Sequence, residues 1–331
     1  MQVQHGGITS PRPALPEGEE ELREAPPAAP GTGTELPLGF RWGRLRVGAK
    51  QRDTRSAQCF LARDPLLKRE VLLVLRHPEA TAQQRHAHRL IVDAKRLTRV
   101  QHPALRVVYG AGMERQRAGY WRALDGGLTL ADWVAREGAL GGLALLALAQ
   151  GLAGAVHALH DQLIAHGDLH PQAVLRDAAE TGWLLREPGV DSWLDDVGSA
   201  PLLDGTLPYL APERRTDPRA APGLAADLYG LGATLLFAAT GRGPQEPAAW
   251  TLLAARRELP TAFARLLRRL LVVDPLTRPD AAQVVALWRD LEAAPADLLS
   301  PRRRLQRAGW WLLAGLLTAL CGLGVVLRAA G

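Results

Sequence analysis

The spacing of apolar residues changes once along this chain, near residue 80, and that change limits the fold more than any other feature. Before it, the short segments 44–47, 57–62 and 71–75 carry β-like patterns and are separated by charged turns. After it, apolar residues recur at helical spacing over 85–99, 143–162, 224–240, 262–272 and 281–292. Because strands and helices are separated along the chain, we expect an α+β fold with a small β-rich lobe followed by a larger helical lobe.

Residues 1–38 differ in composition from the rest of the chain. They contain seven prolines and a run of glutamates at 17 and 19–21. They show no apolar period and lack the apolar stretch of a secretory signal. A segment so poor in apolar residues cannot build a core. We therefore expect 1–38 to form a disordered arm.

A stretch of 20 residues near the other end, 308–327, carries no charge: AGWWLLAGLLTALCGLGVVL. As a helix it would span about 30 Å, the thickness of a bilayer's hydrocarbon core. Trp310 and Trp311 stand at its start, where aromatic rings favour the membrane interface. A buried core helix would be equally apolar, but the basic linker 296–307 before it favours a membrane anchor. The linker carries Arg302, Arg303, Arg304 and Arg307.

The charges that flank this stretch predict its orientation. Four arginines precede it and only Arg328 follows. By the positive-inside rule we expect a single-pass protein of the inner (cytoplasmic) membrane, with everything up to residue 307 in the cytoplasm. The linker arginines would then meet anionic lipid. Small residues at 314, 318 and 322 share one helix face, which would allow a dimer through the anchor.

Composition argues against two other classes of protein. The net charge of +6 comes almost entirely from arginine, since the chain has three lysines. No arginine-rich helix with interleaved aromatic residues appears, so we expect no nucleic-acid partner. The two cysteines, Cys59 and Cys321, lie far apart and suit neither a disulfide framework nor a metal site.

Five motifs follow one another in the second half of the chain. They are IAHGDLHPQAVLR at 164–176, DSWLDDVGSA at 191–200, GTLPYLAPE at 205–213, DLYGLG at 227–232 and DPLTRP at 274–279. In this order and spacing they resemble the C-terminal lobe of the eukaryotic-like (Hanks-type) serine/threonine protein kinases. Upstream, REVLLVLR at 69–76 and RLIVDAKRLTRVQHP at 89–103 are similar to the third strand and the C-helix of the small kinase lobe.

The resemblance implies a two-lobed kinase-like domain over 39–295. Its N-lobe would cover 39–122 and its C-lobe 128–295, with a hinge near 123–127. In the family, ATP and Mg²⁺ are held between the two lobes, and the γ-phosphate passes to a serine or threonine of a protein.

The resemblance also assigns roles to single residues. Asp168 takes the position of the general base, Thr206 that of the threonine that contacts this base, and Asp196 that of the metal-binding aspartate of the DFG motif, here DVG. Four further residues match structural positions of the family: His166, Glu213, Asp227 and Arg278.

Several residues that handle phosphate and metal in the family are replaced. The loop at 46–57 keeps only Gly48 of three glycines, and Val74 stands where the ATP-binding lysine belongs. Asp93 replaces the glutamate of the C-helix that pairs with this lysine. His170 stands where a lysine touches the γ-phosphate, and Ala173 where an asparagine holds the second metal.

Two functions follow from this mixture. The losses predict a pseudokinase, a kinase fold that serves as a signalling or scaffold module for an unknown cytoplasmic protein partner, with little or no phosphotransfer. The alternative is an active, atypical serine/threonine kinase that uses ATP and Mg²⁺. In that case Asp168 would be the base and Lys50, from the glycine loop, would replace the missing lysine. Gly167 replaces the arginine that would bind an activation-loop phosphate, so we expect no control of that kind.

Overall fold

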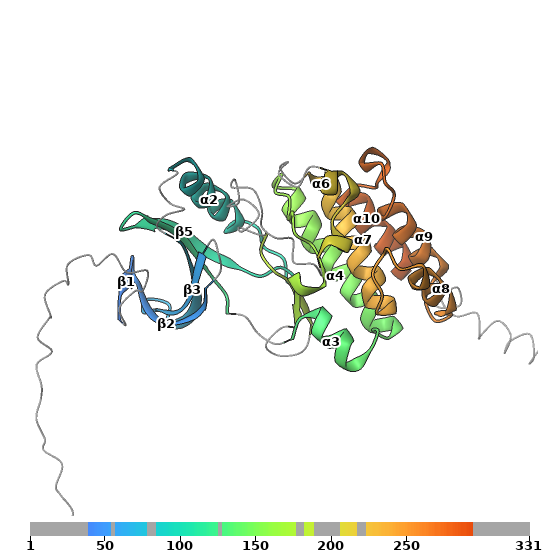
Figure 1. The fold of residues 1–331 in the computed structure, drawn as a ribbon, viewed down its shortest axis with the longest axis horizontal. Helices are drawn as coiled ribbons and strands as arrows, with labels where there is room; N and C mark the ends of the chain where they lie inside the picture. Colours follow the sequence, from blue (N-terminus) through green and yellow to red (C-terminus); the bar gives the residue numbers. More distant parts are fainter. Residues whose placement is uncertain are drawn as a thin grey trace, which may run out of the picture. The chain divides into compact units, whose positions relative to one another are not determined.

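The computed structural model of the chain describes residues 39–53, 57–77, 84–124, 128–176, 182–188, 206–216 and 223–293 (Figure 1). The arm at 1–38, the linker at 296–307 and the anchor at 308–327 lie outside the described residues, as does Asp196. Of the expected hinge, the residues 125–127 are also outside them.

The β-rich part is a six-stranded sheet in which all neighbouring strands are antiparallel, in the order β1-β2-β3-β4-β6-β5. The strands are β1 (Arg41–Trp42), β2 (Leu45–Asp53), β3 (Ala57–Asp64), β4 (Arg69–Arg76), β5 (Val108–Glu114) and β6 (Arg117–Arg122). The three strands expected from β-like sequence patterns are therefore confirmed as β2, β3 and β4. The last two were not expected, because glycines interrupt their apolar pattern. One of them, Gly119, lets β6 approach β4: a Cβ there would lie 2.6 Å from the Val74 carbonyl oxygen.

One face of the sheet packs against helix α2 (Gln84–Leu97). Alternation along β4 places Leu72 and Val74 on the same side of the strand, and both belong to the same buried apolar cluster as Leu90, Ala94 and Leu97 of α2. The side chain at position 74 is thus part of the core between sheet and helix, and it is 7% exposed.

The remaining helices follow the sheet along the chain and pack together as the helical part (Figure 1). They are α3 (Leu130–Glu137), α4 (Gly142–His160), α6 (Pro212–Thr216), α7 (Leu224–Thr240), α8 (Pro247–Ala255), α9 (Thr261–Leu270) and α10 (Ala281–Ala293). All five helices expected from apolar spacing are confirmed, as α2, α4, α7, α9 and α10. Helix α7 contacts α4, α8 and α9, and α4 contacts α10. Most of α7 is buried, which explains why it is apolar on every side.

Helix α4 is, within the described residues, the one helix long and apolar enough to cross a membrane, with 19 residues and a mean hydropathy of 1.7. Its position explains this composition in another way, because Leu145, Leu152 and Leu159 are fully buried against the neighbouring helices. We therefore interpret α4 as the central core helix of the helical part.

The sheet and the helical part are joined next to a short hairpin. Strand β7 (Val174–Arg176) pairs with β8 (Trp183–Leu185). Leu185 also forms a parallel bridge with Leu105, which belongs to the segment that leads into β5. Two backbone hydrogen bonds flank this bridge, from Leu185 N to the Ala104 carbonyl at 2.7 Å and from Arg106 N to the Leu185 carbonyl at 2.9 Å. The residues just after β8 are thereby held close to the start of β5.

Candidate functional site

The loop after α4 carries the sequence HGDLH, and Asp227 of α7 holds its shape. One carboxylate oxygen of Asp227 accepts a hydrogen bond from the backbone N–H of His166 at 2.7 Å, and the other accepts one from the N–H of Gly167 at 2.8 Å. Nε2 of His160 lies 2.9 Å from the same carboxylate. Gly167 has a positive φ of 78°, a conformation that favours glycine. A buried carboxylate with three donors is a rigid support for the residue that follows, Asp168.

His166, the first residue of this sequence, is buried and only 1% exposed. Its Nε2 is 2.9 Å from the carbonyl oxygen of Arg186, so Nε2 carries the proton and donates it. Its Nδ1 accepts a hydrogen bond from the backbone N–H of Asp168 at 3.3 Å. Burial is the largest influence on the pKa of His166 and lowers it, although the charges of Asp227 and Asp168 act in the opposite direction. The ring is therefore neutral near pH 7 and ties the loop to the segment after β8.

Asp168 presents a half-exposed carboxylate, with a side chain that is 46% accessible. Burial acts to raise the pKa of Asp168, but the hydrogen bond from His170, together with the charges of His170, His166 and Arg186, lowers it to about 2. Nε2 of His170 lies 3.3 Å from Oδ1 of Asp168, and Nδ1 of the same ring lies 2.8 Å from the Gln172 side-chain oxygen. The carboxylate is thus ionised at neutral pH and available to accept a hydrogen bond from a bound hydroxyl.

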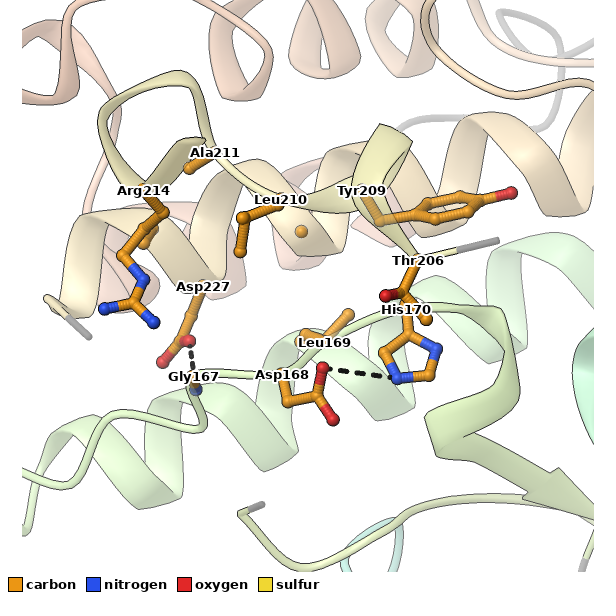
Figure 2. A pocket seen from close by; sticks show the side chains of 12 residues that line it. Gly167, Asp168, Leu169, His170, Thr206, Tyr209, Leu210, Ala211, Arg214 and Asp227 are labelled. Atoms are coloured by element: carbon orange, nitrogen blue, oxygen red, sulfur yellow. Dashed lines mark hydrogen bonds and ion pairs between the residues drawn. The ribbon is translucent and has the colours of Figure 1, made fainter. Parts of the chain in front are cut away.

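Asp168 lines a small pocket with a cavity volume of about 20 Å³, which we call the catalytic-loop pocket (Figure 2). Its lining includes Asp168, His170, Thr206, Tyr209, Arg214 and Asp227. The structure therefore brings together Asp168, Thr206 and Asp227, which are far apart in sequence. Gly48, Lys50 and Asp93 do not line this pocket.

Glu213 and Arg278 form a bidentate ion pair. Nη1 of Arg278 donates to Oε1 of Glu213 at 2.6 Å and Nη2 donates to Oε2 at 2.8 Å. The same guanidinium also donates to the backbone carbonyls of Ala225, Val272 and Val273. Arg278 is 8% exposed, so the pair ties α6 to the start of α7 and to the turn after α9 in a protected place.

The residues expected to contact a nucleotide lie on the sheet and on α2. Lys50 is exposed on β2, and its Nζ lies 3.1 Å from Oδ2 of Asp53. Asp93 of α2 has its carboxylate 3.7 Å from Nη1 of Arg96. Gly48 lies on β2, where a Cβ would come within 3.1 Å of the Leu61 carbonyl oxygen, so this glycine serves close strand packing. Val74 supplies no charge at all.

A buried ionic cluster that sequence reasoning missed lies where β8 meets the sheet. Glu187, two residues beyond β8, is 3% exposed. Its Oε1 lies 2.6 Å from Nε of Arg122 and accepts a hydrogen bond from the Tyr120 hydroxyl at 3.2 Å, and its Oε2 lies 3.5 Å from Nη1 of Arg106. Arg106, Tyr120 and Arg122 are each no more than 5% exposed. We call these four residues the Glu187 cluster.

One sequence signal could have revealed Glu187. The stretch REPG at 186–189 has an acidic residue followed two positions later by glycine, which is the spacing of DVG at 196–198. The sequence gives no signal that arginines would surround Glu187. Arg122 lies 65 positions earlier, and only the tertiary fold brings it to the carboxylate.

The described residues do not fit a magnesium nucleotide well. No group of three His, Cys, Asp or Glu side chains within them could hold a metal ion. Ala173 is 1% exposed and offers no side-chain oxygen. Glu187 has a suitable carboxylate, but two arginines and a tyrosine already surround it.

Comparison with solved structures identifies the fold. The kinase domain of Mycobacterium tuberculosis PknI superposes with a TM-score of 0.60 at 18% identity, covering 77% of this chain and 99% of that one. Rad53 in complex with AMP-PNP gives a TM-score of 0.57, also at 18% identity, over 74% of this chain and 65% of that one. The chain has the protein-kinase fold. This confirms the expected two-lobed α+β kinase-like architecture.

Curated relatives of this kinase-like chain are bacterial serine/threonine-protein kinases. It is 28% identical to pkn2 of Myxococcus xanthus over 283 residues, which are 78% of this chain and 33% of that protein. It is 24% identical to PknL of Mycobacterium tuberculosis over 294 residues, which are 83% of this chain and 71% of that protein. It is 36% identical to AfsK of Streptomyces griseus over 99 residues, which are 29% of this chain and 12% of that protein. The chain thus matches a third or less of pkn2 and AfsK, and no protein-family model matches it.

Proposed function

We propose that this chain is a membrane-anchored pseudokinase, a protein-kinase fold that acts as a signalling or scaffold module with little or no phosphotransfer. The observation that carries the proposal is the Glu187 cluster. In this cluster, two buried arginines and a tyrosine contact the carboxylate of Glu187, the first acidic side chain after β8.

The chemistry of phosphoryl transfer explains why this matters. A kinase neutralises the charge of the triphosphate with a lysine and with metal ions held by carboxylate and amide oxygens. Here the lysine position is Val74, packed in the apolar cluster with α2, and the asparagine position is the buried Ala173. A metal at Glu187 would have to displace Arg122 from a 2.6 Å contact. These features remove most of the charge handling that the reaction needs. Asp196, which lies outside the described residues, remains the candidate for a further metal-binding carboxylate.

An active, atypical serine/threonine kinase is the second candidate, and Asp168 favours it. Its ionised, half-exposed carboxylate faces the catalytic-loop pocket together with Thr206, an arrangement that would accept a hydrogen bond from a substrate hydroxyl. ATP and Mg²⁺ would be its cofactors. Lys50 would supply the nucleotide contact, which requires it to leave Asp53.

A phosphotransfer assay with radiolabelled ATP distinguishes the two candidates. The full chain is incubated with Mg²⁺ and a general protein substrate, beside Asp168→Ala, Lys50→Ala and Lys68→Ala variants. The pseudokinase proposal expects the wild-type chain and all three variants to give the same background incorporation. Incorporation that disappears in Asp168→Ala and Lys50→Ala but persists in Lys68→Ala would establish the active kinase instead.

The membrane part of the proposal rests on the sequence of 296–327. The uncharged stretch 308–327 would anchor the chain in the inner membrane, with the kinase-like domain in the cytoplasm and the arginines at 302–307 against anionic lipid. The small residues along the anchor would allow it to dimerise, and the module would serve a cytoplasmic protein partner. Membrane fractionation tests the anchor. The full chain should resist extraction by alkaline carbonate, whereas a chain that ends at residue 307 should be released, and equal release of both would refute the anchor.

A further inference from the structure

Helix α9 presents three arginines on its exposed side. Arg265, Arg268 and Arg269 lie three and four positions apart, so they share one face of the helix. All three are exposed, and none forms an ion pair or a hydrogen bond through its side chain with another described residue. The opposite side of α9 is apolar and buried, with Phe263 and Leu267 in the core that it shares with α7. The core thus holds the helix with its positive face toward solvent.

Two aliphatic side chains stand almost fully in solvent in the loop that follows α9. Val273 is 73% exposed and Leu276 is 92% exposed. The backbone of this loop is held in place, because Arg278 donates to the Val273 carbonyl at 3.0 Å and the Asp274 carboxylate accepts from the Leu276 N–H at 2.9 Å. Asp274 is the one acidic residue between 259 and 279. The loop therefore presents apolar side chains beside a surplus of positive charge.

The neighbouring helices connect this face with the end of the chain that carries the expected anchor. Figure 1 shows α9 beside α8 and α10, and the rings of Phe263 on α9 and Trp288 on α10 lie 5.7 Å apart. On the α8 side, the guanidinium of Arg268 lies 5.6 Å from the ring centre of Trp250, a residue type that favours membrane interfaces. Residues 294–307 join the end of α10 to the uncharged stretch and span at most about 50 Å. A chain anchored by 308–327 would keep α9 within reach of the membrane.

We propose that Arg265, Arg268, Arg269, Val273 and Leu276, which we call the α9 face, dock the kinase-like domain on an anionic lipid surface. The three guanidinium groups would meet lipid phosphates, and each arginine close to such a surface strengthens the attraction by about fivefold. The two aliphatic side chains would enter the boundary between headgroups and acyl chains. This inference rests on the proposed membrane anchor and adds to it an orientation of the domain.

The test uses the full chain with an environment-sensitive fluorophore, NBD, at the most exposed position of the face. Cys59 and Cys321 are changed to Ala, and Leu276→Cys carries the label. The labelled chain is reconstituted into vesicles of phosphatidylcholine alone or with an equal part of anionic phosphatidylglycerol. We expect the emission to move to shorter wavelength and to strengthen only with the anionic lipid. The response should be lost in 1 M NaCl, where charges are screened beyond about 3 Å.

Two sets of substitutions show whether the response belongs to the α9 face. Arg265→Gln, Arg268→Gln and Arg269→Gln, combined in the labelled chain, should abolish it. The control removes the same number of charges from exposed arginines of the sheet and should keep it: Arg41→Gln, Arg46→Gln and Arg63→Gln. A response that survives the α9 substitutions, or that both sets abolish equally, would overturn the inference.

Flotation of the labelled chain with the neutral vesicles reads the anchor separately. A chain that fails to float with neutral lipid but gives the fluorescence response with anionic lipid would refute the anchor and still support the α9 face. A chain that floats with both kinds of vesicle and gives the same emission in each would keep the anchor and overturn the inference.

Discussion

Glu187 shows at the scale of one residue how this fold departs from the expectations of its sequence. The carboxylate is 3% exposed and is contacted by side chains from β6 and from the segment before β5. A buried carboxylate of this kind needs its partners, and they need it, because an ion left alone in the interior is strongly destabilising. The cluster therefore joins the sheet to the helical part through charge as well as through the Leu105–Leu185 bridge.

The first prediction is that Glu187→Ala lowers the free energy of unfolding by about 3–5 kcal/mol, because Arg106 and Arg122 lose the carboxylate that both contact. Urea unfolding of the full chain in detergent measures this loss. Arg242→Ala is the control, since Arg242 and its partner Glu246 are both about half exposed and such a pair contributes about 0–1 kcal/mol. Equal effects of the two substitutions would show that the cluster is not structural.

The second prediction concerns His166 and pH. Burial lowers the pKa of His166 in the folded chain below its ordinary value of 6.5. Below pH 6.5 the unfolded chain therefore binds a proton more readily than the folded one. The stability that neutral His166 contributes is thus complete above this pH and is lost as the pH falls toward the folded pKa.

Measured by urea unfolding between pH 7.5 and 5, the free energy of unfolding should fall with pH. His166→Gln should reduce this slope, whereas replacement of the exposed His88 should not. Part of the slope will remain in His166→Gln, because burial also lowers the pKa of His102. An unchanged slope in His166→Gln would contradict the prediction.

At the scale of elements, helix α7 approaches the catalytic loop so closely that only glycine fits at position 230. A Cβ there would lie 2.7 Å from the carbonyl oxygen of Leu169. Since Leu169 follows Asp168 directly, the close packing of α7 against Leu169 fixes the position of the loop backbone beside Asp168. The same helix supplies Asp227, so one element both supports and positions the candidate base.

The third prediction is that Gly230→Ala destabilises the chain by about 1–3 kcal/mol, the usual cost of overpacking. Helix propensity alone predicts the opposite sign, since alanine is favoured over glycine by about 1 kcal/mol inside a helix. Gly223→Ala, at the N-cap of the same helix, is the control for packing, because no atom lies within 4 Å of a Cβ there and its cost is limited to the N-cap preference for glycine over alanine. Thermal unfolding of both variants measures the difference, and stabilisation by Gly230→Ala would contradict the packing argument.

Element boundaries were predicted well from apolar spacing because period and burial are local properties. Helix α7 occupies the expected range 224–240, and α4 differs from its expected range by one residue at the start and two at the end. The Glu187 cluster was not predictable, because its members come from three separate segments and meet only through the tertiary fold. Arg214 was missed for a related reason: its burial beside the catalytic-loop pocket depends on the tertiary fold, and the sequence pattern around PERR does not indicate it.

At the scale of the whole molecule, residues that support the fold keep their interactions, whereas several residues that would bind a nucleotide are replaced or already contacted by other side chains. The Glu213–Arg278 pair and the contacts of Asp227 are complete. The lysine position is apolar, and the carboxylate after β8 is engaged by arginine. This separation supports our proposal that the kinase fold of this chain serves binding rather than phosphotransfer.

The measurement that tests this account most directly is a thermal melt of the full chain with about 1 mM ATP, with and without Mg²⁺. A kinase that bound MgATP with a Kd near 10 μM would gain about 2.7 kcal/mol under these conditions. For a domain of this size, that gain corresponds to a rise of roughly 5–10 °C. We predict no magnesium-dependent rise. A rise of that size, absent from a Lys50→Ala variant, would contradict the account and establish a nucleotide site in this chain.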